Sequence, residues 1–180
     1  MMMGSNSLHN LRMTAYASLL AALTAVGAYI AIPIGPVPIV LQNLFVYLTG
    51  LLLGSRWGLM GITAYLLAGA VGLPVFAGGK GGIGHLIGPT GGYLLGFLPA
   101  VALIGFVTEK TQGKILFAVI ALVTATLVIY ACGITWLSIV TNMTIIQSLL
   151  VGMVPFLPGD AVKIAAALFI AKTLRPMMPQ

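Results

Sequence analysis

The chain carries very little charge for its length. Only 6% of its 180 residues are Asp, Glu, Lys or Arg, against roughly 25% in a typical soluble domain, and 60% are apolar. A soluble fold needs a charged, water-facing shell, and so few charged residues cannot supply one. The composition therefore excludes an ordinary soluble domain and favours an integral membrane protein.

Acidic residues are scarcest of all. Two Asp and Glu stand against eight Lys and Arg, which leaves a formal net charge of +6. Such an excess is typical of proteins that bind nucleic acid or sit in a membrane. The cations here are scattered among apolar neighbours and form no basic patch. We therefore expect membrane lipid, and no nucleic acid, as a partner.

Cysteine and histidine are nearly absent as well. Cys132 is the only cysteine, so no internal disulfide can form. His85 has no second metal-binding residue close to it in the sequence, so we expect no metal site and no cofactor. The nucleophile-elbow and zinc-protease motifs are missing, and no second carboxylate lies near Asp160. These absences argue against an enzyme.

One glycine-rich segment formally matches a nucleotide-binding motif. Gly79, Gly81 and Gly84 have the spacing GxGxxG. A dinucleotide site also needs a preceding strand and a following helix in a βαβ unit, which this apolar chain does not offer. A Walker A loop needs Ser or Thr after the lysine, whereas Gly81 follows Lys80. The chain is therefore expected to have no ATP site of its own.

Long apolar runs are what the sequence has in abundance. A helix needs about 20 apolar residues to cross roughly 30 Å of hydrocarbon, and Pro or Gly clusters end such helices. We predict one all-α transmembrane domain over residues 1–180, with six transmembrane helices at about 14–32, 39–54, 57–72, 91–107, 115–137 and 160–174.

The connections between these helices differ in kind. A long Gly-rich outer loop joins the third helix to the fourth, and Thr90 is placed to cap the fourth helix. A broken segment precedes the sixth helix: residues 145–156 are expected to form a short helix or loop over the outer end. Asp160, after Pro158 and Gly159, is then expected to be the N-cap of the sixth helix.

The positions of the cations predict the orientation. Short loops rich in Lys and Arg stay cytoplasmic. Six of the eight cations fall on one side of the predicted topology, Lys80 alone falls on the other, and Lys163 lies inside the sixth helix. Both termini are therefore expected in the cytoplasm, in a multi-pass protein of the cell membrane. The first ten residues lack a small-residue cleavage site, so we expect no cleaved signal peptide.

Asp160 and Lys163 stand out as a pair of opposite charges within apolar sequence. Their i, i+3 spacing places them on one face of a helix. One interpretation is structural: Asp160 caps the helix and Lys163 neutralises it. The other is a binding site, because intramembrane charges are costly and broken transporter helices direct their N-terminal ends at substrate. Such a pair suits a polar, weakly charged small molecule.

A stripe of small residues marks the first predicted helix. Ala17, Ala21 and Ala25 recur at i, i+4 and i+8, so another helix can approach closely there. Spacing alone leaves two interpretations open, packing within the protein and docking of a partner helix.

Three segments together resemble the BioY family, the biotin-binding S components of energy-coupling factor (ECF) transporters. They are VPIVLQN at 37–43, the glycine-rich block from 72 to 93, and PGDxxK at 158–163. The resemblance covers nearly the whole chain. It implies a six-helix membrane protein that captures biotin from outside, together with a T component and two ATPase subunits as partners.

Site residues follow from the same resemblance. Asp160 and Lys163 would hold polar atoms of biotin, and the loop with Lys80 would cover the pocket together with Tyr93. The residues expected to bind substrate are Gln42, Gly79, Lys80, Thr90, Tyr93, Asp160 and Lys163. The resemblance also favours docking of the T component on Ala17, Ala21 and Ala25.

Three other hypotheses remain open from the sequence. One is a self-sufficient biotin carrier or facilitator that works without ATPase partners, as one bundle or as a homo-oligomer. Another is an S component for a different vitamin. The third is a structural membrane subunit that binds no ligand.

Overall fold

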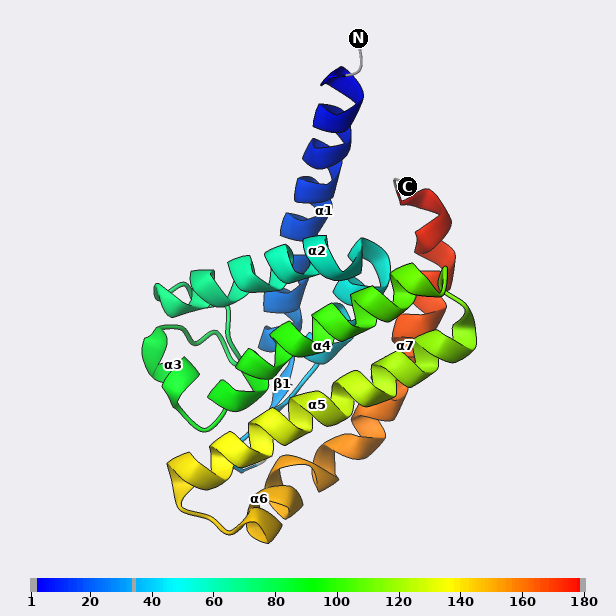
Figure 1. Ribbon diagram of the computed structural model, residues 1–180. Helices are drawn as coiled ribbons and strands as arrows, with labels where there is room; N and C mark the ends of the chain where they lie inside the picture. The colour runs from blue at the N-terminus through cyan, green and yellow to red at the C-terminus, as the bar shows by residue number, and fades with distance from the viewer. Residues whose placement is uncertain (1–2, 34, 179–180) are drawn as a thin grey trace.

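The protein is a bundle of long helices with one small β-hairpin. The computed structural model describes residues 3–33 and 35–178, with side chains from residue 7 onward (Figure 1). The elements are α1 (Met3–Tyr29), β1 (Ala31–Ile32), β2 (Ile39–Val40), α2 (Gln42–Ala70), α3 (Ile83–Ile87), α4 (Gly91–Lys110), α5 (Ile115–Thr141), α6 (Ile145–Gly152) and α7 (Leu157–Leu174). Short 3-10 turns, Val154–Phe156 and Arg175–Met177, flank α7.

Helix α2 is folded back on itself. Gln42 and Tyr65 form a hydrogen bond of 2.8 Å, although 23 residues of straight helix would separate them by about 35 Å. The chain reverses at Gly54, whose φ of 75° lies in the left-handed region that favours glycine. The two antiparallel arms of α2 occupy the ranges of the second and third predicted helices.

A carboxylate from α4 holds this reversal. Glu109 accepts hydrogen bonds from the Ser55 backbone N–H at 2.7 Å and from the Ser55 hydroxyl. The bond satisfies one of the N–H groups that a helix start leaves without a partner. A Cβ added to Gly54 would collide with the same carboxylate. Glu109 thus caps the second arm of α2.

The proline-rich segment between α1 and α2 forms a feature that the sequence analysis missed. β1 and β2 pair antiparallel, with Ala31 opposite Val40 and Ile32 opposite Ile39. Three prolines in this segment disfavour helix and donate no hydrogen bonds, which suits a short two-stranded ladder. The hairpin delays the start of α2 to Gln42, three residues after the predicted start.

Glycines bring α4 against α5, and this contact positions the wall of the site. Gly92 lies against Trp136, and Gly96 lies against the α5 backbone at Ile129. Side chains at these two positions would push the helices apart. Figure 1 shows α4 and α5 lying side by side along their length.

Helix α7 begins earlier than predicted. It starts at Leu157, so Asp160 lies in its first turn and is not the N-cap residue. Pro158 is tolerated in the first turn because the N–H it lacks would have had no partner within the helix. The prediction that Asp160 caps the helix is therefore wrong, and its carboxylate is available for side-chain partners.

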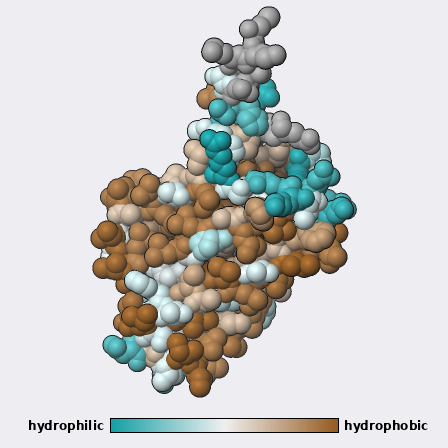
Figure 2. Space-filling view, in the orientation of Figure 1, coloured by the Kyte–Doolittle hydropathy of each residue, from teal (hydrophilic) through white to brown (hydrophobic). Residues whose placement is uncertain are grey.

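The surface and the helix lengths fit a multi-pass membrane protein. Within the described part of the chain, five helices are long and apolar enough to cross a bilayer, with the folded α2 counted as one. Figure 2 shows an apolar body, with hydrophilic side chains gathered around the projecting part of α1 and the neighbouring end of the molecule. The all-α membrane fold is confirmed. The count of six spanning helices stays a prediction.

Candidate functional site

The first turns of α7 bring the two predicted charges together inside the protein. Lys163 Nζ lies 2.8 Å from Asp160 Oδ1, and the residues are only 7% and 2% exposed. The i, i+3 spacing stacks them on one helix face. Two charges so well shielded from water are costly unless each finds a partner, so this pair needs further contacts to be satisfied.

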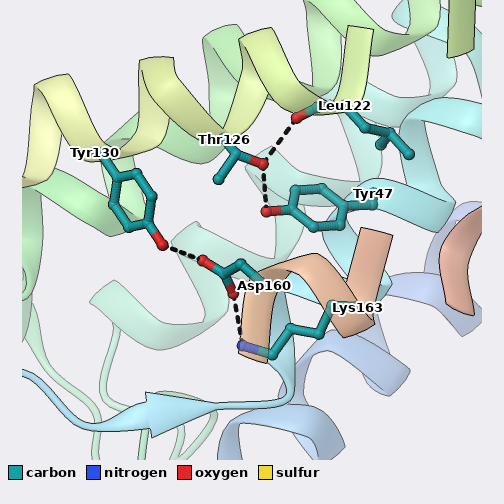
Figure 3. A network of polar contacts seen from close by, with 6 residues as sticks. All are labelled: Tyr47, Leu122, Thr126, Tyr130, Asp160 and Lys163. Carbon is teal, nitrogen blue, oxygen red and sulfur yellow. Dashed lines mark hydrogen bonds and ion pairs between the residues drawn. The ribbon is translucent and has the colours of Figure 1, made fainter. Parts of the chain in front are cut away.

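Tyr130 on α5 supplies one of those contacts. Its hydroxyl donates to Asp160 Oδ2, the oxygen that Lys163 does not engage. Figure 3 shows the phenol of Tyr130 and the ammonium of Lys163 meeting the carboxylate from opposite sides. The two donors fix the rotamer of Asp160. The carboxylate is thereby held in place before any ligand arrives.

A second chain of hydrogen bonds lies beside this carboxylate. The Thr126 hydroxyl donates to the Leu122 carbonyl at 2.8 Å, so its oxygen accepts from the Tyr47 hydroxyl at 2.7 Å. Tyr47 is completely buried. In Figure 3 its hydroxyl points toward Thr126. These bonds order the floor of the site, where α2 and α5 meet α7.

A pocket opens above the Asp160–Lys163 pair. It has a volume of about 50 Å³ and is partly open to the outside. Polar and apolar side chains share its wall. The lining residues are Val37, Pro38, Val40, Gln42, Asn43, Phe76, Ala77, Thr90, Tyr93, Leu94, Phe97, Ile129, Tyr130, Phe156, Asp160 and Lys163.

Five of the seven predicted substrate-binding residues are among them: Gln42, Thr90, Tyr93, Asp160 and Lys163. They come from three helices and a helix-capping position that are far apart in the sequence. Thr90 occupies the N-cap position of α4, as expected, but its side chain makes no capping hydrogen bond. Its hydroxyl is thus not committed to the helix end.

The other two predicted residues, Gly79 and Lys80, lie outside the pocket wall. Lys80 is exposed, and its carbonyl accepts from the Phe76 N–H at 2.8 Å. Gly79 packs against the ring of Tyr29, with a φ of 74°. Direct contact of these two residues with a ligand is not supported here. Their turn instead places Phe76, which is fully buried, in the wall.

The loop that carries Phe76 is fastened to two helices. Tyr29 donates its hydroxyl to the Pro74 carbonyl, and Tyr65 donates to the Val75 carbonyl at 3.0 Å. Tyr65 also accepts the bond from Gln42, so a wall residue and the loop share one anchor. These bonds hold the loop against the helices.

His85 stacks on the outer side of Phe76. The two rings are 6.1 Å apart and nearly parallel. Partial burial, and then the positive charge of Lys80, lower the pKa of His85 below its usual value of 6.5. The stacked imidazole supports the Phe76 ring in the wall from outside.

Known proteins match this chain over almost its full length. The model of the BioY family matches residues 3–180. The chain belongs to the BioY family. A probable biotin transporter BioY of Pyrococcus horikoshii is 42% identical, covering 88% of this chain and 93% of its own length. The biotin transporter BioY of Thermotoga maritima is 41% identical, with 89% and 94% covered.

A solved structure has the same fold. The S-component for biotin from an ECF-type ABC transporter superposes with a TM-score of 0.87 at 32% identity, covering 93% of this chain and 92% of that one. The resemblance to the BioY family seen in three short segments is thus confirmed across the chain. Membership of a transporter family agrees with the expectation that this protein is not an enzyme.

Sequence reasoning missed several wall residues of this BioY-family pocket. Tyr130 carried a usable signal, because a phenol four residues after Thr126 in a very apolar helix marks a polar face. Asn43 stands next to Gln42 and was passed over. The aromatic residues Phe97 and Phe156 gave no signal, since sequence does not distinguish a pocket wall from a core position.

The alanine stripe on α1 faces partly inward. Ala17 is 6% exposed and lies against Gly61 of α2, while Ala21 and Ala25 are half-buried. Exposed small residues of α1 include Ala15, Ser18 and Ala22, at i, i+3 and i+7. A partner helix approaching α1 therefore meets this second stripe. Docking through Ala17 is at odds with its burial.

Proposed function

We propose that this chain captures biotin at its outer end, as the S component of an ECF transporter in the cell membrane. The observation that carries the proposal is the buried Asp160–Lys163 pair beneath an otherwise mostly apolar pocket. Membership of the BioY family, whose relatives include a biotin transporter and an S-component for biotin, supports biotin as the substrate.

The chemistry of biotin suits this wall. Biotin has a neutral ureido ring with two N–H donors and one carbonyl, an apolar thioether ring and a carboxylate tail. Asp160 can accept from a ureido N–H, and Lys163 can donate to the carbonyl. Phe76, Phe97 and Phe156 offer apolar surface for the thioether ring. The neutral ureido ring suits the Asp160–Lys163 pair, because the charges of these two side chains already neutralise each other.

The chain has no recognisable ATP site, so we assign energy coupling to two ATPase subunits joined through a T component. The proposed docking surface is the outward stripe of α1, with Ser18 at its centre. We infer that both termini are cytoplasmic, because Arg12, Arg56, Lys110, Lys114, Lys172 and Arg175 fall on one side of the topology, as short cytoplasmic loops require.

Titration calorimetry of the purified protein tests the substrate. We expect one biotin per chain. Asp160→Asn should weaken binding by about 2 kcal/mol or more, because it removes a charge-assisted acceptor. His9→Gln, a half-buried position at the other end of the molecule, serves as the control. Unchanged affinity in Asp160→Asn, or tighter binding of thiamine or riboflavin than of biotin, would refute the proposal.

A pair of tryptophan substitutions tests the docking surface. Ser18→Trp should block co-purification with the T component while biotin binding persists, because the bulky ring projects from the outward stripe. The comparison is Leu19→Trp, because Leu19 is also exposed but has a larger side chain than Ser18. Strong uptake by the wild type in a host without any ECF subunits would instead support the self-sufficient carrier.

A further inference from the structure

A second hollow lies at the end of the molecule opposite the pocket. The reversal of α2, the α4–α5 loop and the last turn of α7 surround a space of about 830 Å³. A neighbouring cavity of about 280 Å³ shares part of its wall, including Thr108 and Arg175. Lys172 lines both spaces. It lies twelve residues after Asp160 on the same helix, which is a distance of about 18 Å along the axis. Capture of substrate at the outer pocket does not use this hollow.

The polar part of the hollow is basic. Lys172 and Arg175 of the α7 end face it, and Glu109 is the only acid among the lining residues. The oxygens of Glu109 are already engaged by the N–H and hydroxyl of Ser55. Two cations therefore stand against one occupied carboxylate, so the hollow favours an anion.

Most donors of Arg175 are still available. Its Nη2 donates to the Thr108 carbonyl at 3.3 Å, which is the hydrogen bond recorded for this side chain in the described part of the protein. The guanidinium lies over Gly113, where φ is 71° and an added Cβ would overlap it. A guanidinium has five N–H donors in a planar fork suited to phosphate. Arg175 is thus held in place with donors to spare.

The buried hydroxyl of Thr108 provides independent evidence that the hollow binds a ligand. It is 3% exposed, and its hydroxyl has no hydrogen-bond partner among residues 7–33 and 35–178. Buried hydroxyls almost always find a partner, because leaving one unpaired costs free energy. Thr108 lines both cavities, so a ligand bound there can receive this hydroxyl.

The smaller cavity continues the hollow as an apolar channel. Its walls between α5 and α7 are made by Ile115, Ala118, Leu168 and Ala171. An inorganic anion would leave this apolar surface without contact. A molecule with a phosphate head and a hydrocarbon chain would fill both parts.

We propose that the hollow binds the phosphate group of an anionic phospholipid, through Lys172, Arg175 and Thr108, with an acyl chain between α5 and α7. The site lies at the cation-rich end, where anionic lipids are attracted to basic residues of membrane proteins. The bound lipid supplies the acceptor that Thr108 lacks. It also fills the gap between α5 and α7 and thereby stabilises the end of the bundle opposite the biotin pocket.

Native mass spectrometry of the full-length protein in detergent tests the proposal. The probes are dioleoyl phosphatidylglycerol and, as the neutral comparison, dioleoyl phosphatidylcholine. The wild type should retain phosphatidylglycerol about tenfold more strongly. Lys172→Gln should lower that affinity about fivefold, the effect of one cation near a lipid surface, and Thr108→Val should lower it severalfold.

Arg56→Gln is the matched control, because it removes one exposed cation from the same end but lies outside the hollow. Its lipid affinity should equal that of the wild type. Lys172 is exposed, so its variant is expected to fold, and a thermal melt checks this.

Three results would overturn the proposal. The first is equal retention of the two lipids by the wild type. The second is an equal loss in Arg56→Gln and Lys172→Gln, which would indicate diffuse electrostatic attraction. The third is displacement of phosphatidylglycerol by millimolar sodium phosphate, which would identify a site for free phosphate.

Discussion

The Asp160–Lys163 pair should contribute little net free energy to folding, even though removal of either charge alone should be strongly destabilising. In Lys163→Met, Asp160 keeps only the Tyr130 hydroxyl as partner inside a protein where it is 2% exposed. In Asp160→Asn, the Lys163 ammonium is left without its counter-charge. Breaking a buried pair from one side costs about 3–5 kcal/mol, so each single variant should lose about that much stability.

The double variant should behave differently. With Asn at 160 and Met at 163 no buried charge remains, and the Asn carbonyl can still accept from Tyr130. Replacement of a buried pair by neutral groups is often close to neutral, so we expect a loss of at most about 2 kcal/mol. The coupling energy between the two positions is then several kcal/mol.

Reversible unfolding in mixed micelles, followed by tryptophan fluorescence, measures all four proteins. Biotin titration of the same samples should show weak binding in all three variants, the double one included. That outcome assigns the pair to ligand binding rather than stability. The reasoning is refuted if the double variant is destabilised by at least the sum of the single variants.

Three further changes follow from the loop and from the reversal of α2. Gly69→Ala should weaken biotin binding by about 1–3 kcal/mol, because the new Cβ overlaps the Phe76 ring and pushes that ring into the pocket. Gly84→Ala, where the added Cβ meets open space, should bind biotin normally. Equal biotin affinities of the two variants would contradict this reasoning. Lys80→Gln should slow biotin association at low salt and leave dissociation unchanged in stopped-flow measurements, because an exposed cation steers an anionic tail without holding it; a faster dissociation would show direct contact. Gly54→Ala should lower the melting temperature, by the strain of about 1–3 kcal/mol at a positive φ, and a melt like that of Gly84→Ala would argue against it.

The sequence predicted the membrane fold from simple quantities. Scarce charge and long apolar runs were enough for an all-α membrane domain, because a bilayer imposes both features on any chain that crosses it. The isolated pair in PGDxxK indicated the site for the same reason, since intramembrane charge is rarely kept without a use. Both inferences rest on the free energy of placing individual residues in a bilayer, which can be judged from the local sequence alone.

Details of the element ends were less predictable. Asp160 lies in the first turn of α7 rather than at its N-cap, and the hairpin of β1 and β2 replaces the predicted start of the second helix. Around Pro and Gly, several residues are almost equally suitable as the first residue of a helix. Packing against neighbouring elements chooses among them, and that choice leaves no local mark in the sequence.

The sequence by itself determined that this chain spans a membrane and that Asp160 and Lys163 belong together, because composition and i, i+3 spacing act over a few residues. Only the tertiary structure decided which side chains meet that pair. Tyr130 reaches Asp160 across 30 residues, and Phe76 enters the wall because Gly69 leaves it room. Such contacts depend on how helices distant in the chain pack together, and so they come from the three-dimensional fold.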